Sequence, residues 1–70
     1  MKPSDLLQET LHQRVLVEMK GGRSYRGTLD AFDQHLNLVL SSVEEVAPTP
    51  GAPASGLALL RGDSIVFIAP

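Results

Sequence analysis

The 70-residue chain contains no cysteine and no tryptophan, and only 4 % of its residues are aromatic. Without cysteine no disulfide can form, and two histidines, His12 and His35, supply too few ligands for a typical metal site. We therefore expect no metal, no cofactor and no disulfide. A domain of this length buries only about 60 % of its unfolded surface, so its stability in isolation is marginal. Oligomerisation is the remaining source of stability.

The sequence also lacks a long apolar run and an excess of positive charge. Residues 1–5 do not resemble a signal peptide, and no apolar run approaches the roughly 20 residues that span a bilayer. We expect a soluble, cytoplasmic protein that makes no membrane contact. The formal net charge of −2 argues against a broad basic surface for nucleic acid, because such surfaces make many phosphate contacts. Any nucleic-acid site must be local.

Valine, leucine and isoleucine supply most of the apolar side chains, which favours sheet over helix. Residues 3–12 are typical of a short helix, since Pro3 suits a first turn and the leucines form one apolar stripe. Alternating patterns predict three strands, at 14–20, 23–32 and 35–46, and two short apolar runs predict two more, at 57–60 and 65–69. Gly21 and Gly22 predict a tight hairpin turn, and Gly27 predicts a bend, bulge or close backbone approach.

The predicted fold is mainly β: an N-terminal helix followed by a strongly bent, five-stranded antiparallel small barrel that forms one domain, 1–70. Residues 47–56 contain three prolines and two glycines and are predicted to be a loop. The last two strands are apolar. If they form the edges of the sheet, they could pair with a neighbouring chain, and we expect the oligomer contact there.

Two short polar segments carry the candidate site, Asp33–Asn37 and Arg61–Asp63. Residues two apart on a strand face the same way, so Asp33, His35 and Asn37 could project together. If Arg61 meets them, a nucleobase could stack between His35 and Arg61. The Asn37 amide matches the O4 and N3–H edge of uracil, and a flipped amide would match cytosine equally well. Asp33 could select the uracil orientation by accepting one N–H of Asn37.

Each signal also has a simpler explanation. Asp33 and Asn37 are common turn residues, His35 could be an ordinary surface residue, and 61–63 could be a tight turn in which Gly62 supplies a positive φ. Catalysis is poorly supported. Ser41 and Ser42 have the right residue type for a nucleophile, but the pattern provides no nucleophile elbow and no oxyanion donor. We expect a protein that is not an enzyme.

Three segments, 15–23, 25–29 and 32–40, resemble the first motif of the Sm and Sm-like (Lsm) family, particularly its archaeal members. Residues 59–68 resemble the second motif. The resemblance implies the Sm fold, a bent five-stranded sheet capped by a helix. It also implies a ring of identical subunits, heptameric in most archaeal cases, in which the fourth strand of one subunit pairs with the fifth strand of the next. U-rich single-stranded RNA would follow the pore rim, one base per subunit.

The positions that match the family imply stacking by His35 and Arg61 and recognition of the uracil edge by Asn37. The supporting positions that match are Asp33, Gly62 and Asp63. Seven copies of Arg61 around one pore would form a local positive collar on an acidic chain. The expected function is therefore an RNA-binding ring that scaffolds RNA processing or small-RNA complexes. The alternative is a structural or protein-interaction ring with little RNA affinity.

Overall fold

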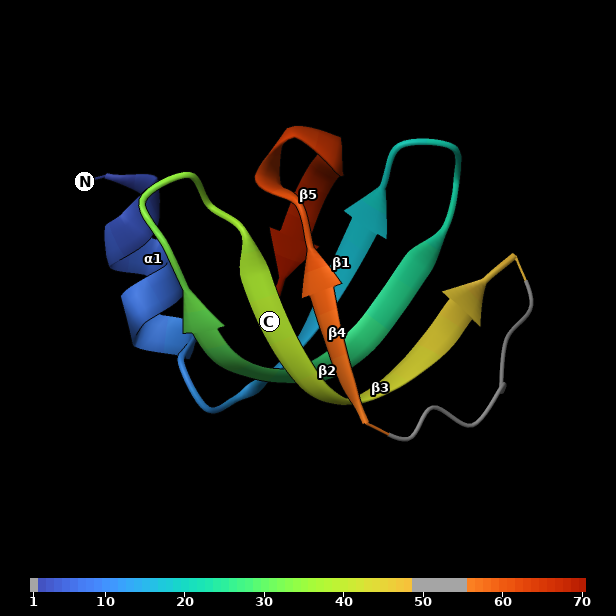
Figure 1. The fold of residues 1–70 in the computed structure, drawn as a ribbon, viewed down its shortest axis with the longest axis horizontal. Helices are drawn as coiled ribbons and strands as arrows, with labels where there is room; N and C mark the ends of the chain where they lie inside the picture. Colours follow the sequence, from blue (N-terminus) through green and yellow to red (C-terminus); the bar gives the residue numbers. More distant parts are fainter. Residues whose placement is uncertain (1, 49–55) are drawn as a thin grey trace.

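A computed structural model describes residues 2–48 and 56–70. The chain begins with one helix, followed by strands that run antiparallel to their neighbours (Figure 1). The elements are α1 (Pro3–Thr10), β1 (Arg14–Met19), β2 (Ser24–Phe32), β3 (Leu38–Ala47), β4 (Leu57–Leu60) and β5 (Ile65–Ala69). Most of the loop predicted at 47–56 lies outside the described residues, and Ala47 belongs to β3.

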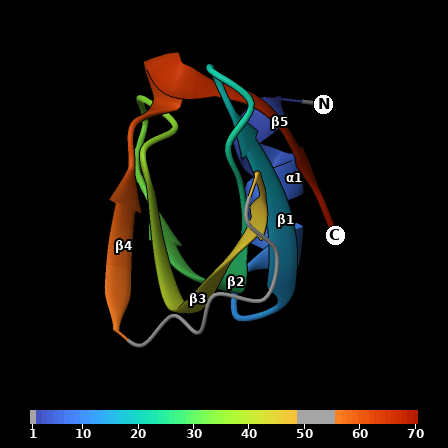
Figure 2. The ribbon, with the colours of Figure 1, turned by 90° about the vertical axis from the view of Figure 1, so that its right-hand side faces the viewer.

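The strands form one sheet in the order β4-β3-β2-β1-β5. The sheet is bent so strongly that β4 stands opposite β1 and β5 (Figure 2). The predicted helix followed by a bent five-stranded antiparallel sheet is therefore confirmed. The prediction that the two last strands form the edges is confirmed as well, because β4 and β5 lie at the two ends of the strand order.

The pairing of β2 with β3 is irregular beside Gly27. The register between these strands shifts between Arg26 and Thr28. A Cβ atom at Gly27 would lie 3.1 Å from the carbonyl oxygen of Ser41 and 3.2 Å from Cβ of Leu40. The strands approach each other too closely here for a side chain without local adjustment, which confirms the predicted bulge and close approach.

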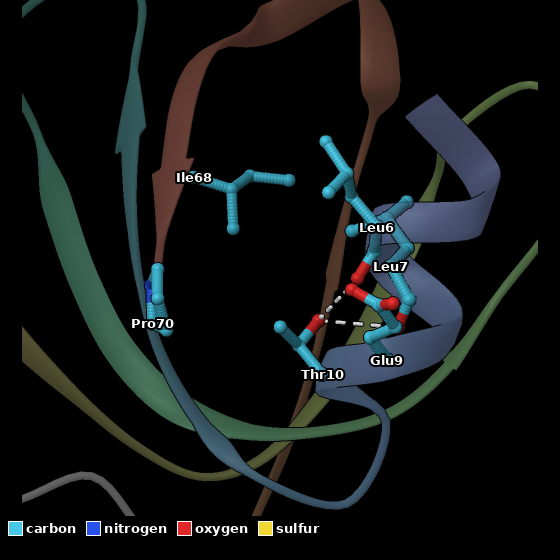
Figure 3. A pocket seen from close by; sticks show the side chains of 6 residues that line it. All are labelled: Leu6, Leu7, Glu9, Thr10, Ile68 and Pro70. Atoms are coloured by element: carbon cyan, nitrogen blue, oxygen red, sulfur yellow. Dashed lines mark hydrogen bonds between the residues drawn. The ribbon is translucent and has the colours of Figure 1, made fainter. Parts of the chain in front are cut away.

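The core fills the inside of the bent sheet, and α1 closes one side of it through Leu7. Its buried members come from α1 and from four of the strands, and they are Leu7, Val15, Val17, Leu29, Leu38, Leu40, Val43 and Leu60. A hollow of about 250 Å³ remains between α1 and β5, lined by Leu6, Leu7, Thr10, Ile68 and their neighbours (Figure 3). In the part of the chain that the structure describes, α1 is too short to cross a membrane.

Two element boundaries differ from the prediction by more than one residue, and the others agree with it to within one residue. The helix ends at Thr10 instead of residue 12, because His12 adopts a left-handed backbone (φ 69°) and donates its N–H to the carbonyl of Leu29. The third strand begins at Leu38 instead of His35, because residues 33–37 form a turn. The hairpin predicted at Gly21 and Gly22 is present, and both glycines have positive φ (90° and 88°).

Candidate nucleic-acid interface

The turn between β2 and β3 is organised by the carboxylate of Asp33. Its Oδ1 accepts hydrogen bonds from the backbone N–H of His35 (2.9 Å) and of Asn37 (3.0 Å). The backbone N–H of Leu36 donates to the carbonyl of Asp33 at 3.0 Å, and Leu36 has a φ of 62°. The expectation that these residues alternate along a strand is therefore wrong. The carboxylate of Asp33, at the start of the segment, accepts these backbone hydrogen bonds and closes the segment into a turn. This agrees with the simpler explanation, in which Asp33 and Asn37 are turn residues.

The second polar segment joins β4 to β5 through a single turn of 3₁₀ helix, η1 (Gly62–Ser64). The backbone N–H of Ser64 donates to the carbonyl of Arg61 at 3.0 Å. Arg61 donates from its guanidinium to the carboxylate of Asp63 at 3.2 Å, and both side chains are largely exposed (76 % and 68 %). Gly62 is not among the positive-φ glycines, so the suggestion that it supplies a positive φ is wrong.

The two segments meet because β3 and β4 are paired. Leu38, at the start of β3, is the register partner of Leu60, at the end of β4. The residues just outside this pair are therefore neighbours, and the N–H of Gly62 donates to Oδ1 of Asn37 at 2.8 Å. A Cβ atom on Gly62 would collide with the carbonyl oxygen of His35 and would lie 2.9 Å from that of Leu36. Glycine is needed here for close approach.

These contacts fix the orientation of the Asn37 amide. Its Nδ2 donates to Oδ2 of Asp33 at 2.9 Å, while its Oδ1 accepts from the N–H of Gly62. An ionised carboxylate only accepts and a backbone N–H only donates, so a flipped amide would lose both bonds. One N–H and one lone pair of the Asn37 amide remain for another molecule. The hydrogen bond predicted between Asp33 and Asn37 is thus present, and Gly62 adds a second anchor that the sequence did not reveal.

The same hydrogen bonds keep Asp33 ionised. Donation from the Asn37 side chain is the largest cause and donation from the Asn37 backbone the next, and together with the N–H of His35 they hold the pKa of Asp33 below its ordinary value of 3.8. Next to it, Nε2 of Gln34 lies 3.4 Å from Nε2 of His35.

A third turn, residues 20–23 between β1 and β2, reaches the same end of the sheet. Both views show it beside the β4–β5 turn, with the β2–β3 turn close by (Figures 1 and 2). The backbone N–H of Lys20 donates to the carbonyl of Ser64 at 2.8 Å. Nothing in the local sequence signals this contact, because it depends on the register of β1 with β5.

Comparison with known proteins extends over almost the whole chain. The family model described as LSM domain matches residues 5–70. An snRNP Sm-like protein of Archaeoglobus fulgidus is 44 % identical over 69 residues, which are 99 % of this chain and 90 % of the relative. The relative from Methanococcoides burtonii is 38 % identical over 69 residues, which are 99 % of this chain and 96 % of that protein.

Two solved structures are similar along the full length of the chain. The Sm protein of Pyrococcus abyssi, solved in complex with a uridine heptamer, superposes with a TM-score of 0.90 at 34 % identity, covering 100 % of this chain and 99 % of that one. The SmAP1 heptamer of Pyrobaculum aerophilum gives a TM-score of 0.89 at 33 % identity, covering 100 % and 93 %.

Proposed function

Because the chain belongs to the LSM domain family, as predicted from its motifs, we propose that it is a subunit of a ring that holds U-rich single-stranded RNA at its pore. The observation that carries the proposal is the fixed amide of Asn37, with one donor and one acceptor still available. These match O4 and N3–H of uracil. Cytosine presents a donor and an acceptor in the reverse order, so it cannot make both bonds to an amide that does not flip.

His35 and Arg61 would hold the base by stacking. The backbones of His35 and Gly62 lie close together, which brings the two segments that carry the stacking candidates side by side. Stacking of a base on such groups contributes about 1–3 kcal/mol per base and tolerates any base. Asn37 therefore supplies the preference for uracil, while His35 and Arg61 supply affinity. Asp63 supports the stack by holding the guanidinium of Arg61.

Assembly into a ring would use the two edge strands. On β4, Leu57 and Leu59 are 75 % and 70 % exposed, and on β5 Phe67 is 45 % exposed. Pairing β4 of one subunit with β5 of the next would satisfy the backbone hydrogen-bonding groups of both edge strands and would cover these side chains. The similarity to heptameric archaeal Sm proteins supports seven subunits. Seven copies of Arg61 around one pore would concentrate positive charge there, and one RNA strand could occupy many weak sites together.

In this proposal the ring is a scaffold for RNA processing or small-RNA complexes, acts in the cytoplasm and performs no chemistry itself. The uridine heptamer bound by the similar Pyrococcus abyssi protein supports an RNA ligand. The alternative is a structural or protein-interaction ring that keeps the edge pairing and has little RNA affinity. The exposed leucines of β4 suit both functions, whereas the donor and the acceptor left available on the anchored amide of Asn37 favour the first.

Titration of the protein with fluorescent oligo-uridine and oligo-cytidine of equal length separates the two functions. We expect oligo-uridine to bind more tightly, and the Asn37→Ala variant to lose most of this preference. Gln8→Ala removes an exposed amide from α1 and serves as the matched control. Equal affinity for the two oligomers in the unmodified protein, with no effect of Asn37→Ala, would favour the alternative.

A further inference from the structure

We propose that Lys20 binds the backbone phosphates of the RNA strand whose bases occupy the Asn37 site, so that the turn 20–23 is a second contact surface for the same ligand. This inference rests on the proposed function. It assigns the binding of the RNA phosphates to a part of the chain outside the two polar segments, Asp33–Asn37 and Arg61–Asp63, that would hold the base.

The position of Lys20 is fixed relative to the base site. Its backbone N–H donates to the carbonyl of Ser64 at 2.8 Å, and the preceding residue, Met19, is the register partner of Ile65. Ser64 ends the 3₁₀ turn that contains Gly62, whose N–H anchors Asn37. The β4–β5 turn therefore connects the turn 20–23 to Asn37, through the bond from Lys20 to Ser64 and the bond from Gly62 to Asn37. Both views show the turn 20–23 beside the β4–β5 turn (Figures 1 and 2).

The base site cannot neutralise a phosphate backbone by itself. It contains two carboxylates, Asp33 and Asp63, and one guanidinium, Arg61, which is already bound to Asp63 at 3.2 Å. Single-stranded nucleic acid brings one negative charge per nucleotide, and proteins that bind it combine stacking with a positively charged groove. A nearby cation is needed.

The other cations of the chain are engaged or lie elsewhere. Arg14 donates to the carbonyl of Ser42 at 2.8 Å and lies 3.7 Å from Glu44. A side-chain hydrogen bond to Tyr25, and to a lesser extent the charge of Glu45, raises the pKa of Arg23. Arg26 is in the middle of β2, opposite Glu44, and Lys2 precedes α1.

Lys20 is exposed and takes part in no ion pair among the described residues, and residues 49–55 carry no charged side chain. It is followed by Gly21 and Gly22, and a Cβ atom at either would meet nothing within 4 Å. The turn is therefore open to a strand that passes beside it. A compact ammonium with three donors suits a phosphate oxygen as a point charge.

The test compares the salt dependence of oligo-uridine binding in the intact protein, Lys20→Gln, Lys20→Arg and Arg26→Gln. Each phosphate that a protein neutralises on a single strand contributes about 0.7 to the slope of log K against log salt concentration. We expect Lys20→Gln to weaken binding and to reduce the slope by about 0.7 for each phosphate that it no longer neutralises, while uridine remains preferred over cytidine. Lys20→Arg should restore the slope, and Arg26→Gln, which removes the same charge from β2, should leave it unchanged.

A slope in Lys20→Gln equal to that of the unmodified protein would overturn the inference. An equal reduction in Arg26→Gln would also overturn it, because the effect would then reflect net charge instead of position. In both cases the proposed function survives, since the unmodified protein still binds and prefers oligo-uridine. Failure of the unmodified protein to bind any oligo-uridine would remove both.

Discussion

The backbone N–H of Gly62 donates to Oδ1 of Asn37 at 2.8 Å, which joins two residues 25 positions apart in the sequence. This bond connects the pairing of β3 with β4 to the chemistry of the candidate site, because it forms only when Leu38 lies opposite Leu60. Together with the bond from Asn37 to Asp33 it determines which end of the amide is a donor. The proposed base preference therefore depends on the tertiary structure.

Replacing Gly62 with alanine should separate the two segments. The added Cβ would collide with the carbonyl of His35 and lie 2.9 Å from that of Leu36, so the chain must shift and the bond to Asn37 breaks. Crowding of this kind typically costs about 1–3 kcal/mol of stability. We expect a lower melting temperature and loss of oligo-uridine preference, measured by thermal unfolding and by titration.

Gly56→Ala is the matched control for this substitution. Gly56 has a φ of 104° with nothing within 4 Å of a Cβ, so alanine there is strained by a positive φ but meets no neighbour. It should lower stability by about 1–2 kcal/mol and leave the uridine preference intact. Retained preference in Gly62→Ala would show that the contact between the segments does not matter for recognition.

Removing the carboxylate of Asp33 should relax the choice between uracil and cytosine. In Asp33→Ala the Asn37 amide loses one of its two anchors, while His35 and Arg61 are still present to stack a base. Loss of this hydrogen bond should lower the preference for uracil by about 2–10-fold per base. Parallel titrations with oligo-uridine and oligo-cytidine measure the ratio. Asp5→Ala at the start of α1 is the control, and an unchanged ratio in Asp33→Ala would refute the role assigned to Asp33.

The carboxyl group of Asp33 should titrate below its ordinary pKa of 3.8, because Asn37 and His35 donate hydrogen bonds to its ionised form. A lowered pKa means that its contribution to turn stability is complete above pH 3.8 and is lost as the pH falls through the folded-state value. Side-chain carboxyl NMR shifts measured against pH follow this group directly. Asn37→Ala should raise the pKa of Asp33, because it removes the largest cause, whereas Gln34→Ala should not move it.

A charge on an edge strand should break the ring into smaller species. Leu59 on β4 is 70 % exposed in the single chain, and in the proposed ring it is covered by the next subunit. Leu59→Lys should therefore reduce the oligomer seen by native mass spectrometry, because an unpaired charge would be buried at the contact. Ala31→Lys places the same charge at an exposed position of β2, an interior strand, and should leave the oligomer intact. A ring of unchanged mass in Leu59→Lys would contradict edge pairing.

The sequence alone predicted correctly the bounds of those strands whose ends are determined by neighbouring residues in the chain. The bounds predicted for the last two strands, 57–60 and 65–69, are those observed, because a polar turn with a glycine separates two purely apolar runs. The glycines at 21, 22 and 27 also marked the hairpin and the bulge correctly. The alternation of polar and apolar residues wrongly predicted that residues 35–37 belong to the third strand, whereas they form a turn. The carboxylate of Asp33 binds two backbone N–H groups there, and a turn closed in this way outcompetes extension of the strand.

The meeting of the two polar segments could not be derived from local patterns. It requires β4 to return along β3 in one particular register, and a shift of one residue would turn Leu60 out of the core and take Gly62 away from Asn37. The resemblance to the family motifs implied that Gly62 supports the site, but it did not explain why a glycine is needed there. The structure supplies that reason, since only a residue without a side chain can approach the carbonyls of His35 and Leu36 so closely.

The structure of the protein bound to an oligo-uridine would test the central claim most directly. The account predicts one uracil per subunit between the His35 ring and the Arg61 guanidinium, with O4 accepting from Nδ2 of Asn37 and N3–H donating to Oδ1. The bonds from Asn37 to Asp33 and from Gly62 to Asn37 should persist in the complex. A uracil bound away from these three side chains, or an Asn37 amide released from its two anchors when the base binds, would contradict the account.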